Sequence, residues 1–558
     1  MLRTKLLLLL LVFGIPSFAK IRKAIEMQKI AQRVIDDQNA NEDVVILDET
    51  DNYAILGSVK GFVVVSKDDS NPAVLGYSHT PYDKHNIPCG LQWWLANINS
   101  TLECGEVYTF RAQRATEEVF QPEVIEPLLT TKWGQGDPFN YLCPKIGTIN
   151  APTGCVATAM AQILYFYRYP EKAEGKGYYT MGGGTYRPIV TVNSTYDWNL
   201  IKDSYANSWF LSEDEKMAIG QLMFDAGVSS HMDYDTGGSG TPIQIAGNGF
   251  AHIFKFDSLA MKCVNRDYCE NDVVWMNTIL KELKANRPVL MGGHDKNSGG
   301  HAFIIDGMDE SGFVHVNWGW NGEADGYYDL MDMNPSNILG VSSTMHFNSS
   351  QAIITNLRCN PIPLEGEVYQ SCWGISVEDN LIKDDLNGLT LSAPNGILWQ
   401  HSHLTFYGQV GLAFFDENNQ EVFFHTFFDT VGPVNHIAPI EGGHGYAASY
   451  FSRISTMDLA TLPPGTYRVF LASKATQDLC SQFICYPGGK HNEYRLTKAA
   501  NGSLTVEKSE PTAIKPLSVS NANVPARYFD LQGREVNAGT KGLVIRKQGN
   551  DVKKVVVR

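Results

Sequence analysis

Residues 152–161 read Pro-Thr-Gly-Cys-Val-Ala-Thr-Ala-Met-Ala, and this stretch decides how the centre of the chain is built. A Pro-Thr-Gly turn leads into an Ala-rich run, which predicts a helix that begins near Cys155 and stops at Pro170. The first turn of a helix carries unpaired N–H groups and roughly half a positive charge, which stabilise a thiolate and lower a thiol pKa from about 8.5. The pattern favours a reactive Cys155, although a small buried core cysteine fits this segment equally well.

Residues 299–307, Gly-Gly-His-Ala-Phe-Ile-Ile-Asp-Gly, place His301 between a glycine turn and an apolar strand. An imidazole there can take the proton of a thiol, provided that the two side chains meet. A solitary histidine is more often structural, and the chain has 14 of them. His294 and Asp295 lie close by, but neither a His-Glu-x-x-His helix nor paired Cys-x-x-Cys ligands occur, so the spacing argues against catalytic zinc. No cofactor is expected.

Two further segments carry polar groups that suit the same chemistry. Residues 131–136 contain Gln135, whose amide N–H, with the main-chain N–H of Cys155, can donate to a developing oxyanion. Residues 315–322, His-Val-Asn-Trp-Gly-Trp-Asn-Gly, place Asn317 one strand beyond the histidine, where it can orient an imidazole, and Trp318 can screen that bond from water. Taken alone, Gln135 is ordinary, and residues 315–322 equally fit a packed aromatic strand end.

The order Gln, Cys, His and Asn-Trp resembles the streptopain family of papain-like cysteine peptidases. The likeness covers about residues 125–355 and rests on residues 133–135, 153–159, 300–303 and 315–320. It implies a cysteine endopeptidase that acts on proteins and peptides, with one role for each residue already named: Cys155 the nucleophile, His301 the general base, Gln135 the oxyanion donor, and Asn317 and Trp318 the supports of the imidazole. Residues 231–240 are similar to a glycine-rich active-site loop of the family, with additional Asp residues.

The resemblance extends towards the N-terminus. Residues 62–66 and 73–77 are similar to the inhibitory prodomain of such zymogens, which implies an intramolecular inhibitor and activation by cleavage between roughly Arg111 and Leu129. At the other end, residues 528–534, 542–545 and 553–558 resemble the sorting domains used for type IX secretion, which implies contact with secretion machinery. An ordinary terminal hairpin fits those C-terminal residues as well.

The first residues predict export. Arg3 and Lys5 precede the apolar run at 6–15, and residues 17–19, Ser-Phe-Ala, suit cleavage after position 19, as in a secretory signal peptide. The apolar run would be only about 15 Å long as a helix, half the thickness of a hydrocarbon core, so a membrane anchor is excluded. The protein is therefore expected outside the cell or on its surface. A formal charge of −15 argues against nucleic acid as a partner.

The 558 residues suggest three or four folded units at roughly 100 to 200 residues per domain. The fold class is α+β: a papain-like catalytic domain, with a helical part and an antiparallel sheet, follows a small α+β prodomain and precedes a β-sandwich and a short C-terminal β module. The expected boundaries are 1–19 for the signal peptide, 20–122 for the prodomain, 123–356 for the peptidase domain, 360–508 for the sandwich and 512–558 for the sorting-like module.

Local patterns predict individual elements. These are a helix at 21–37, strands at 53–58, 62–66 and 73–77, one helix after Cys155, strands at 289–291, 302–305, 313–317 and 327–330, alternating runs at 404–407, 412–415 and 421–425, and terminal β runs at 528–531, 543–545 and 555–557. Among the ten cysteines, Cys263 with Cys269 and Cys480 with Cys485 are plausible local disulfides. The alternative to an enzyme is a surface adhesin or inhibitor-like binding protein with a non-catalytic papain-like domain, in which the side chains of Cys155 and His301 never meet.

Overall fold

The structure is a computed structural model. It describes residues 21–35, 44–69, 71–103, 120–206, 210–258, 260–269, 271–295, 299–330, 351–359, 375–378, 381–385, 388–392, 397–400, 405–434, 436–442, 445–447, 459–476, 481–484, 493–509, 527–529, 535–536, 542–548 and 551–557. The predicted signal peptide, residues 111–119 of the expected activation-cleavage region and the Cys480–Cys485 pair lie outside these residues. Among the helices within them, none is long and apolar enough to cross a bilayer.

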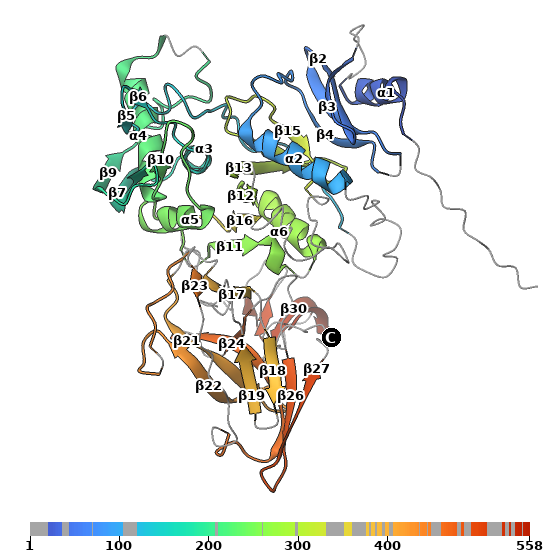
Figure 1. Ribbon diagram of the computed structural model, residues 1–558, viewed down its shortest axis with the longest axis vertical. Coiled ribbons are helices and arrows are strands. Elements are labelled where there is room, and N and C mark those ends of the chain that lie inside the picture. The colour runs from blue at the N-terminus through green and yellow to red at the C-terminus, as the bar shows by residue number, and fades with distance from the viewer. Residues whose placement is uncertain are drawn as a thin grey trace, which may run out of the picture.

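A ten-stranded antiparallel sheet forms the framework of the first 360 residues, with β15 and β4 at its middle (Figure 1). In spatial order its strands are β1 (Val45–Glu49), β2 (Tyr53–Ser58), β3 (Gly61–Ser66), β4 (Val74–Ser78), β15 (Gly326–Tyr328), β14 (Val314–Asn317), β13 (Gly299–Met308), β12 (Val289–Asp295), β16 (Ala352–Thr355) and β11 (Lys262–Asn265). The predicted strands of both modules are therefore confirmed. The sequence analysis treated these modules as separate units, whereas they share one sheet.

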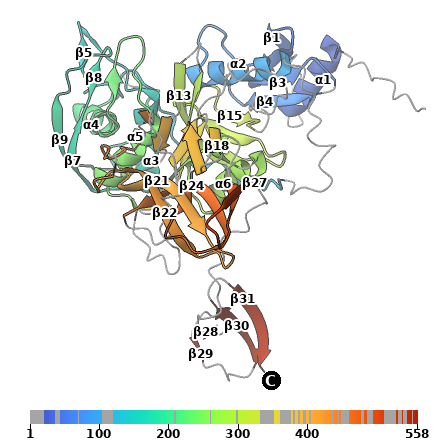
Figure 2. The ribbon, with the colours of Figure 1, turned by 60° about the horizontal axis from the view of Figure 1, so that its bottom comes forward.

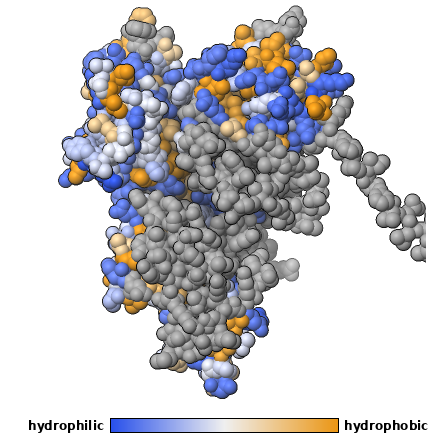
Figure 3. Space-filling model, in the orientation of Figure 1, coloured by the Kyte–Doolittle hydropathy of each residue, from blue (hydrophilic) through white to orange (hydrophobic). Residues whose placement is uncertain are grey.

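The seam between them is the pairing of β4 with β15, in which Gly76, Tyr77 and Ser78 face Tyr328, Tyr327 and Gly326. We call residues 21–103 the N-terminal module. Its helix α1 (Ala24–Ile35) lies within the predicted range and packs through Met27 and Ala31 on β2 and β3. Figure 3 shows its hydrophobic surface residues interspersed with hydrophilic ones on the face in view, as is usual for a solvated surface.

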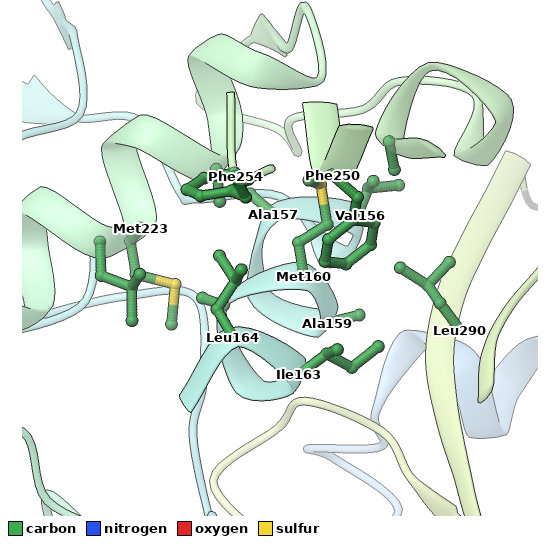
Figure 4. Packing of buried hydrophobic residues seen from close by; sticks show 14 of the residues in the cluster. Val156, Ala157, Ala159, Met160, Ile163, Leu164, Met223, Phe250, Phe254 and Leu290 are labelled. Atoms are coloured by element: carbon green, nitrogen blue, oxygen red, sulfur yellow. The ribbon is translucent and has the colours of Figure 1, made fainter. Parts of the chain in front are cut away.

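Each face of the sheet around β13 carries its own helical layer. Because side chains alternate along a strand, Ala302 and Ile304 join one buried cluster while Phe303 and Ile305 join another. The first cluster packs against α3 (Cys155–Tyr167), α4 (Glu213–Ser229) and α5 (Ile243–His252); we call this side the α3 face, and Figure 4 shows its packing around α3. The second packs against α2 (Cys89–Glu103) and α6 (Asp272–Lys284), and we call this side the α2 face.

Helix α3 begins at Cys155 and ends at Tyr167, as the sequence predicts. The residue that follows, Arg168, adopts a left-handed conformation with φ 49°, and Pro170 comes two positions later. All residues from Val156 to Tyr165 are buried. The prediction of a single helix in this part of the chain is incomplete, because α4, α5 and α6 also form; α2 was missed as well.

Short elements complete the central part. They are β5 (Lys145–Ile146), β6 (Ile149–Asn150), β7 (Lys172–Tyr178), β8 (Thr180–Met181), β9 (Ile189–Thr195), β10 (Asp233–Tyr234) and the 3-10 turn η3 (Arg266–Tyr268). Strand β8 pairs with β10, so the chain near residue 181 lies beside the start of the glycine-rich loop.

The described residues after 360 form strands and the turns between them, as predicted (Figure 2). Its strands are β17 (Ile375–Glu378), β18 (Leu381–Asp385), β19 (Gly388–Ser392), β20 (Ile397–Gln400), β21 (Gly408–Phe415), β22 (Glu421–Asp429), β23 (Gly445–Ala447), β24 (Gly465–Ala475), β25 (Gln482–Phe483), β26 (Glu493–Lys498), β27 (Leu504–Ser509), β28 (Arg527–Phe529), β29 (Glu535–Val536), β30 (Gly542–Gln548) and β31 (Asp551–Val557). The predicted runs at 412–415 and 421–425 are confirmed as parts of β21 and β22, which pair with each other as a hairpin. The run at 404–407 contributes only an isolated bridge at Phe406.

Candidate active site

The chain approaches Cys155 through a turn that only glycine fits. Gly154, the N-cap of α3, has φ 86°, and a Cβ there would lie 2.7 Å from the Met232 sulfur and 2.9 Å from the Ser239 carbonyl oxygen. Ser239 also donates a hydrogen bond from Oγ to the carbonyl oxygen of Pro152 at 2.7 Å. The glycine-rich loop therefore lies directly against the turn that presents the cysteine.

The sulfur of Cys155 lies among main-chain donors. The N–H groups of Ala302, Val156 and Cys155 itself lie close enough to the sulfur to lower the pKa of the thiol. Burial raises that pKa by more, so the net shift is upward. The sequence analysis predicted the helix N-terminal donors but was wrong about the net direction, because the enclosure of the sulfur depends on residues distant in sequence.

His301 occupies the start of β13, immediately before Ala302, and is partly buried. Its Cα pairs with that of Gly293 on β12, a residue without a side chain. Because the N–H of Ala302 lies close to the Cys155 sulfur, the main chain at His301 lies near Cys155 although the two residues are far apart along the chain. The proton transfer between them stays a prediction.

Gln135 is tied to the same turn. Its main-chain oxygen accepts a hydrogen bond from the N–H of Thr153 at 3.0 Å, two residues before Cys155. Its side-chain nitrogen Nε2 is buried and has no hydrogen-bond partner among the residues that the structure describes. A buried amide donor without a partner suits the predicted role of Gln135 as oxyanion donor, and that role stays a prediction.

Asn317, at the end of β14, has a buried side chain with well-defined partners. Its Nδ2 donates to the main-chain oxygen of Thr131 at 2.8 Å, and its Oδ1 accepts from Gln162 Nε2 at 3.2 Å and from the N–H of Gly319 at 3.0 Å. These contacts hold β14 against α3. The predicted role of Asn317 in orienting the imidazole stays a prediction.

Trp318 turns to the opposite side of the sheet. Its indole packs against Phe303 with ring centroids 4.9 Å apart, and Nε1 donates to the carbonyl oxygen of Ala324 at 3.0 Å. A Cβ added at Gly90 of α2 would lie 2.3 Å from an indole carbon. Trp318 thus connects the end of β14 to the N-terminal module.

A second cluster of buried polar side chains comes from β13, from β14 and from the residue before β15. His315 Nδ1 and Asp306 Oδ1 are 2.6 Å apart, and Asp306 Oδ2 accepts from the N–H of Leu129 at 2.9 Å. Burial works to lower the pKa of His315, but the hydrogen bond and charge of Asp306 raise it overall. Burial raises the pKa of Asp325 to about 7, and its Oδ1 accepts from the N–H of Trp318. Through Leu129, Asp306 thus binds the segment before Gln135 to the sheet.

Sequence reasoning missed Gln162, which contacts Asn317 from within α3. The signal was its position as the only polar side chain in the apolar run at 159–165. The predicted Cys263–Cys269 disulfide is wrong, because Cys263 carries a free thiol in a buried site. Within the described residues, no group of three or more His, Cys, Asp or Glu side chains could hold a metal ion.

Comparisons with known proteins cover the part of the chain that carries this site. The model of the Peptidase C10 family matches residues 133–328. Streptopain from Streptococcus pyogenes is 33% identical over 330 residues, which cover 55% of this chain and 80% of streptopain. The thiol protease/hemagglutinin PrtT from Porphyromonas gingivalis is 31% identical over 319 residues, which cover 54% of this chain and 36% of PrtT.

Among solved structures, a fragment of prointerpain A from Prevotella intermedia is similar, with 30% identity and a TM-score of 0.49, over 58% of this chain and 100% of the fragment. The active wild-type interpain A cysteine protease from the same organism has 33% identity and a TM-score of 0.37, over 42% of this chain and 98% of that structure. By its likeness to streptopain over most of that protein's length, together with the family match across the site, the chain belongs to the streptopain family, Peptidase C10, and is a cysteine peptidase.

Proposed function

We propose that this protein is made as a zymogen and, once matured, cleaves peptide bonds of proteins with a dyad of Cys155 and His301. The imidazole takes the thiol proton as the sulfur attacks the scissile carbonyl carbon, and then gives that proton to the departing amine. The C–N bond breaks and a thioester remains on Cys155. Water hydrolyses the thioester, which releases the acid product and restores the thiol.

The closeness of the Ala302 N–H to the Cys155 sulfur carries this proposal, because Ala302 directly follows His301 on β13. The unpartnered Nε2 of Gln135 adds to it. A buried donor without a partner costs about 1–3 kcal/mol, and such a cost is explained if the donor meets an oxyanion during the reaction. Asn317 and Trp318 would support the imidazole from β14.

The N-terminal module would act as the inhibitory prodomain, within the expected span of residues 20–122. Three contacts support this role: β4 extends the catalytic sheet at β15, α2 packs against β13, and Gly90 lies against Trp318. The module therefore touches both the strand that carries His301 and the indole beside Asn317. Cleavage between about Arg111 and Leu129 would separate it from the peptidase domain.

Export would follow from the signal peptide at residues 1–19, and the C-terminal module would engage secretion machinery. Both proposals rest on the sequence patterns described above. The strands β28, β30 and β31 are consistent with the terminal β module that the sorting resemblance implies.

A thiol-directed peptidyl probe tests the proposal. We expect the matured protein to carry the adduct on Cys155, and Cys155→Ala to lose self-processing and casein hydrolysis by several powers of ten, since members of a dyad act as a unit. Cys359→Ala is the matched control, because Cys359 is another partly buried free thiol. The dyad proposal would be wrong if Cys155→Ala processed itself and cut casein as fast as the parent. Absence of labelling at Cys155 would favour the adhesin alternative.

A further inference from the structure

Gln162 is a buried polar residue that the proposed chemistry does not use. It lies seven positions after Cys155 on α3, about two helical turns or 10 Å away, so it does not touch the reacting atoms. Its side chain has 0% exposure and is surrounded along the helix by apolar residues. Burial of an amide in such a place is unfavourable unless both of its ends find partners.

Both ends do find partners, and the partners bond to each other. Oε1 of Gln162 accepts from Thr131 Oγ1 at 2.6 Å, and Nε2 donates to Asn317 Oδ1 at 3.2 Å. Nδ2 of Asn317 then donates to the main-chain oxygen of Thr131 at 2.8 Å, which closes a ring of three hydrogen bonds. We call these three residues the Gln162 ring.

The ring joins the three segments that carry the proposed catalytic groups. Gln162 belongs to the helix that begins at the nucleophile, Thr131 lies four residues before Gln135, and Asn317 ends β14 next to Trp318. Close packing leaves little room for these segments to shift: Gly319 has φ 68°, and a Cβ there would lie 3.2 Å from Thr158 Cγ2 and 3.9 Å from Gln162 Nε2.

We propose that Gln162 is a positioning residue, which holds α3 in register with the segment that carries Gln135 and with β14. This inference rests on the proposed function of Cys155 and Gln135. An apolar side chain would fill the same space, but it would leave Thr131 and Asn317 each short of one bond. Since the donor must meet the oxyanion in the transition state, loss of register lowers kcat rather than the affinity for substrate.

The test uses the full-length chain carrying Gln162→Met, matured in trans by a trace of the parent enzyme. We expect kcat on a fluorogenic peptide to fall roughly ten- to hundredfold, the scale of a misplacement of about 1 Å, while KM changes less than about twofold. Gln221→Met is the matched control, because Gln221 is a helical glutamine of α4 that bonds to Asp225 away from the ring.

Gln162→Glu separates positioning from packing. A neutral carboxyl keeps one donor and one acceptor, whereas a carboxylate only accepts and would face Asn317 Oδ1. We therefore expect the ratio of kcat for Gln162→Glu to kcat for Gln162→Met to rise as pH falls, with the melting temperature recorded at each pH. If the ratio of the two kcat values only follows the difference between the melting temperatures of the two variants, then Gln162 has a structural role and no positioning role.

Unchanged kcat in Gln162→Met, with Cys155 still labelled by the peptidyl probe, would overturn the positioning role and leave the dyad intact. If the parent itself is not labelled at Cys155, the proposed function fails first. Thr131→Val serves if Gln162→Met does not fold, because it removes only the hydroxyl that bonds to Gln162. It should lower kcat in the same direction, and parent-like kcat in this variant would equally reject the ring.

Discussion

The two faces of the central sheet differ in where their helices come from. The α3 face is covered by α3, α4 and α5, all of which follow residue 150. The α2 face is covered by α6 and by α2, and α2 belongs to the N-terminal module that we propose is removed on maturation. Under the proposed function, this difference would be a division of labour, in which the α3 face holds the proposed nucleophile in place and the α2 face controls when the enzyme acts.

The test of this division with the largest expected effect on stability replaces a buried tryptophan of the α2 face. Trp94 is completely buried, lies 4.8 Å from the Tyr328 ring between centroids, and donates from Nε1 to the Asp329 carbonyl oxygen. In a Cys155→Ala background, Trp94→Ala should lower the free energy of unfolding of the full-length chain by about 3–5 kcal/mol. Denaturant titration measures the change.

Ile163→Ala on α3 is the matched variant for the other face, because Ile163 is also completely buried. It should cost about 2–5 kcal/mol in both the full-length chain and the matured enzyme. Protein matured from the Trp94→Ala chain should have parental stability, since it no longer contains α2. A destabilised matured protein from that variant would contradict the division.

A second test forces α2 away from the indole without creating a cavity. Gly90→Leu places atoms where even a Cβ would lie 2.3 Å from Trp318, and overpacking of this kind costs about 1–3 kcal/mol. That cost corresponds to roughly 5- to 150-fold faster labelling of Cys155 in the unprocessed chain. Ala96→Leu, on the exposed side of α2, is the control and should label at the parental rate. Equal rates for all three chains would show that α2 does not restrict the site.

A third test concerns how the free energy of unfolding depends on pH through a buried carboxyl group beside the seam between β4 and β15. Asp325 has a pKa of about 7 in the folded protein because of burial, against about 3.9 in an unfolded chain. Between about pH 4 and 7 the folded state binds more protons, so the free energy of unfolding falls as pH rises, by at most about 1.4 kcal/mol per pH unit for this one group.

Asp325→Asn should flatten this decline, because the amide carries no titrating proton and its Oδ1 can still accept from the Trp318 N–H. Denaturation midpoints measured from pH 4 to 7 in parent and variant give the two slopes. Identical slopes would show that Asp325 does not take up this proton and would reject its raised pKa.

The smallest expected effect belongs to an exposed ion pair. Lys284 on α6 contacts Glu123 at 2.6 Å, and about half of each side chain is exposed. Lys284→Ala should change the free energy of unfolding by less than about 1 kcal/mol, and the change should vanish in high salt. A larger, salt-independent effect would mean that this pair helps to fix the segment before the peptidase domain.

Local patterns were enough for much of the fold. The Ala-rich run after Gly154 and the stop at Pro170 defined α3, and the alternating runs defined β2, β3, β13 and β14. The capping box of Ser212 and Glu215 was a readable signal for α4 that the sequence analysis did not use. The pairing of β4 with β15 had no local signal, because it joins residues about 250 positions apart.

The candidate site, like the fold, could be predicted from the sequence only in part. Residue types and their order along the chain singled out Cys155, His301 and Gln135, since nucleophile, base and amide donor are chemical requirements. The net pKa shift of Cys155 could not be obtained that way, because it depends on how fully the fold encloses the sulfur. Gln162 was hidden for a related reason, since its partners Thr131 and Asn317 come from other segments.

The seam at β15 has one more consequence. While the N-terminal module is present, Gly326, Tyr327 and Tyr328 lie inside a continuous ladder of strands. If maturation removes the module, as we propose, their main-chain groups on that side would face water. An unpaired edge strand can pair with extended segments of other molecules. Here the edge strand β15 has only three residues, which limits that tendency. Maturation would thus expose a new edge strand, which would make the matured enzyme more prone to self-association than its precursor at high concentration.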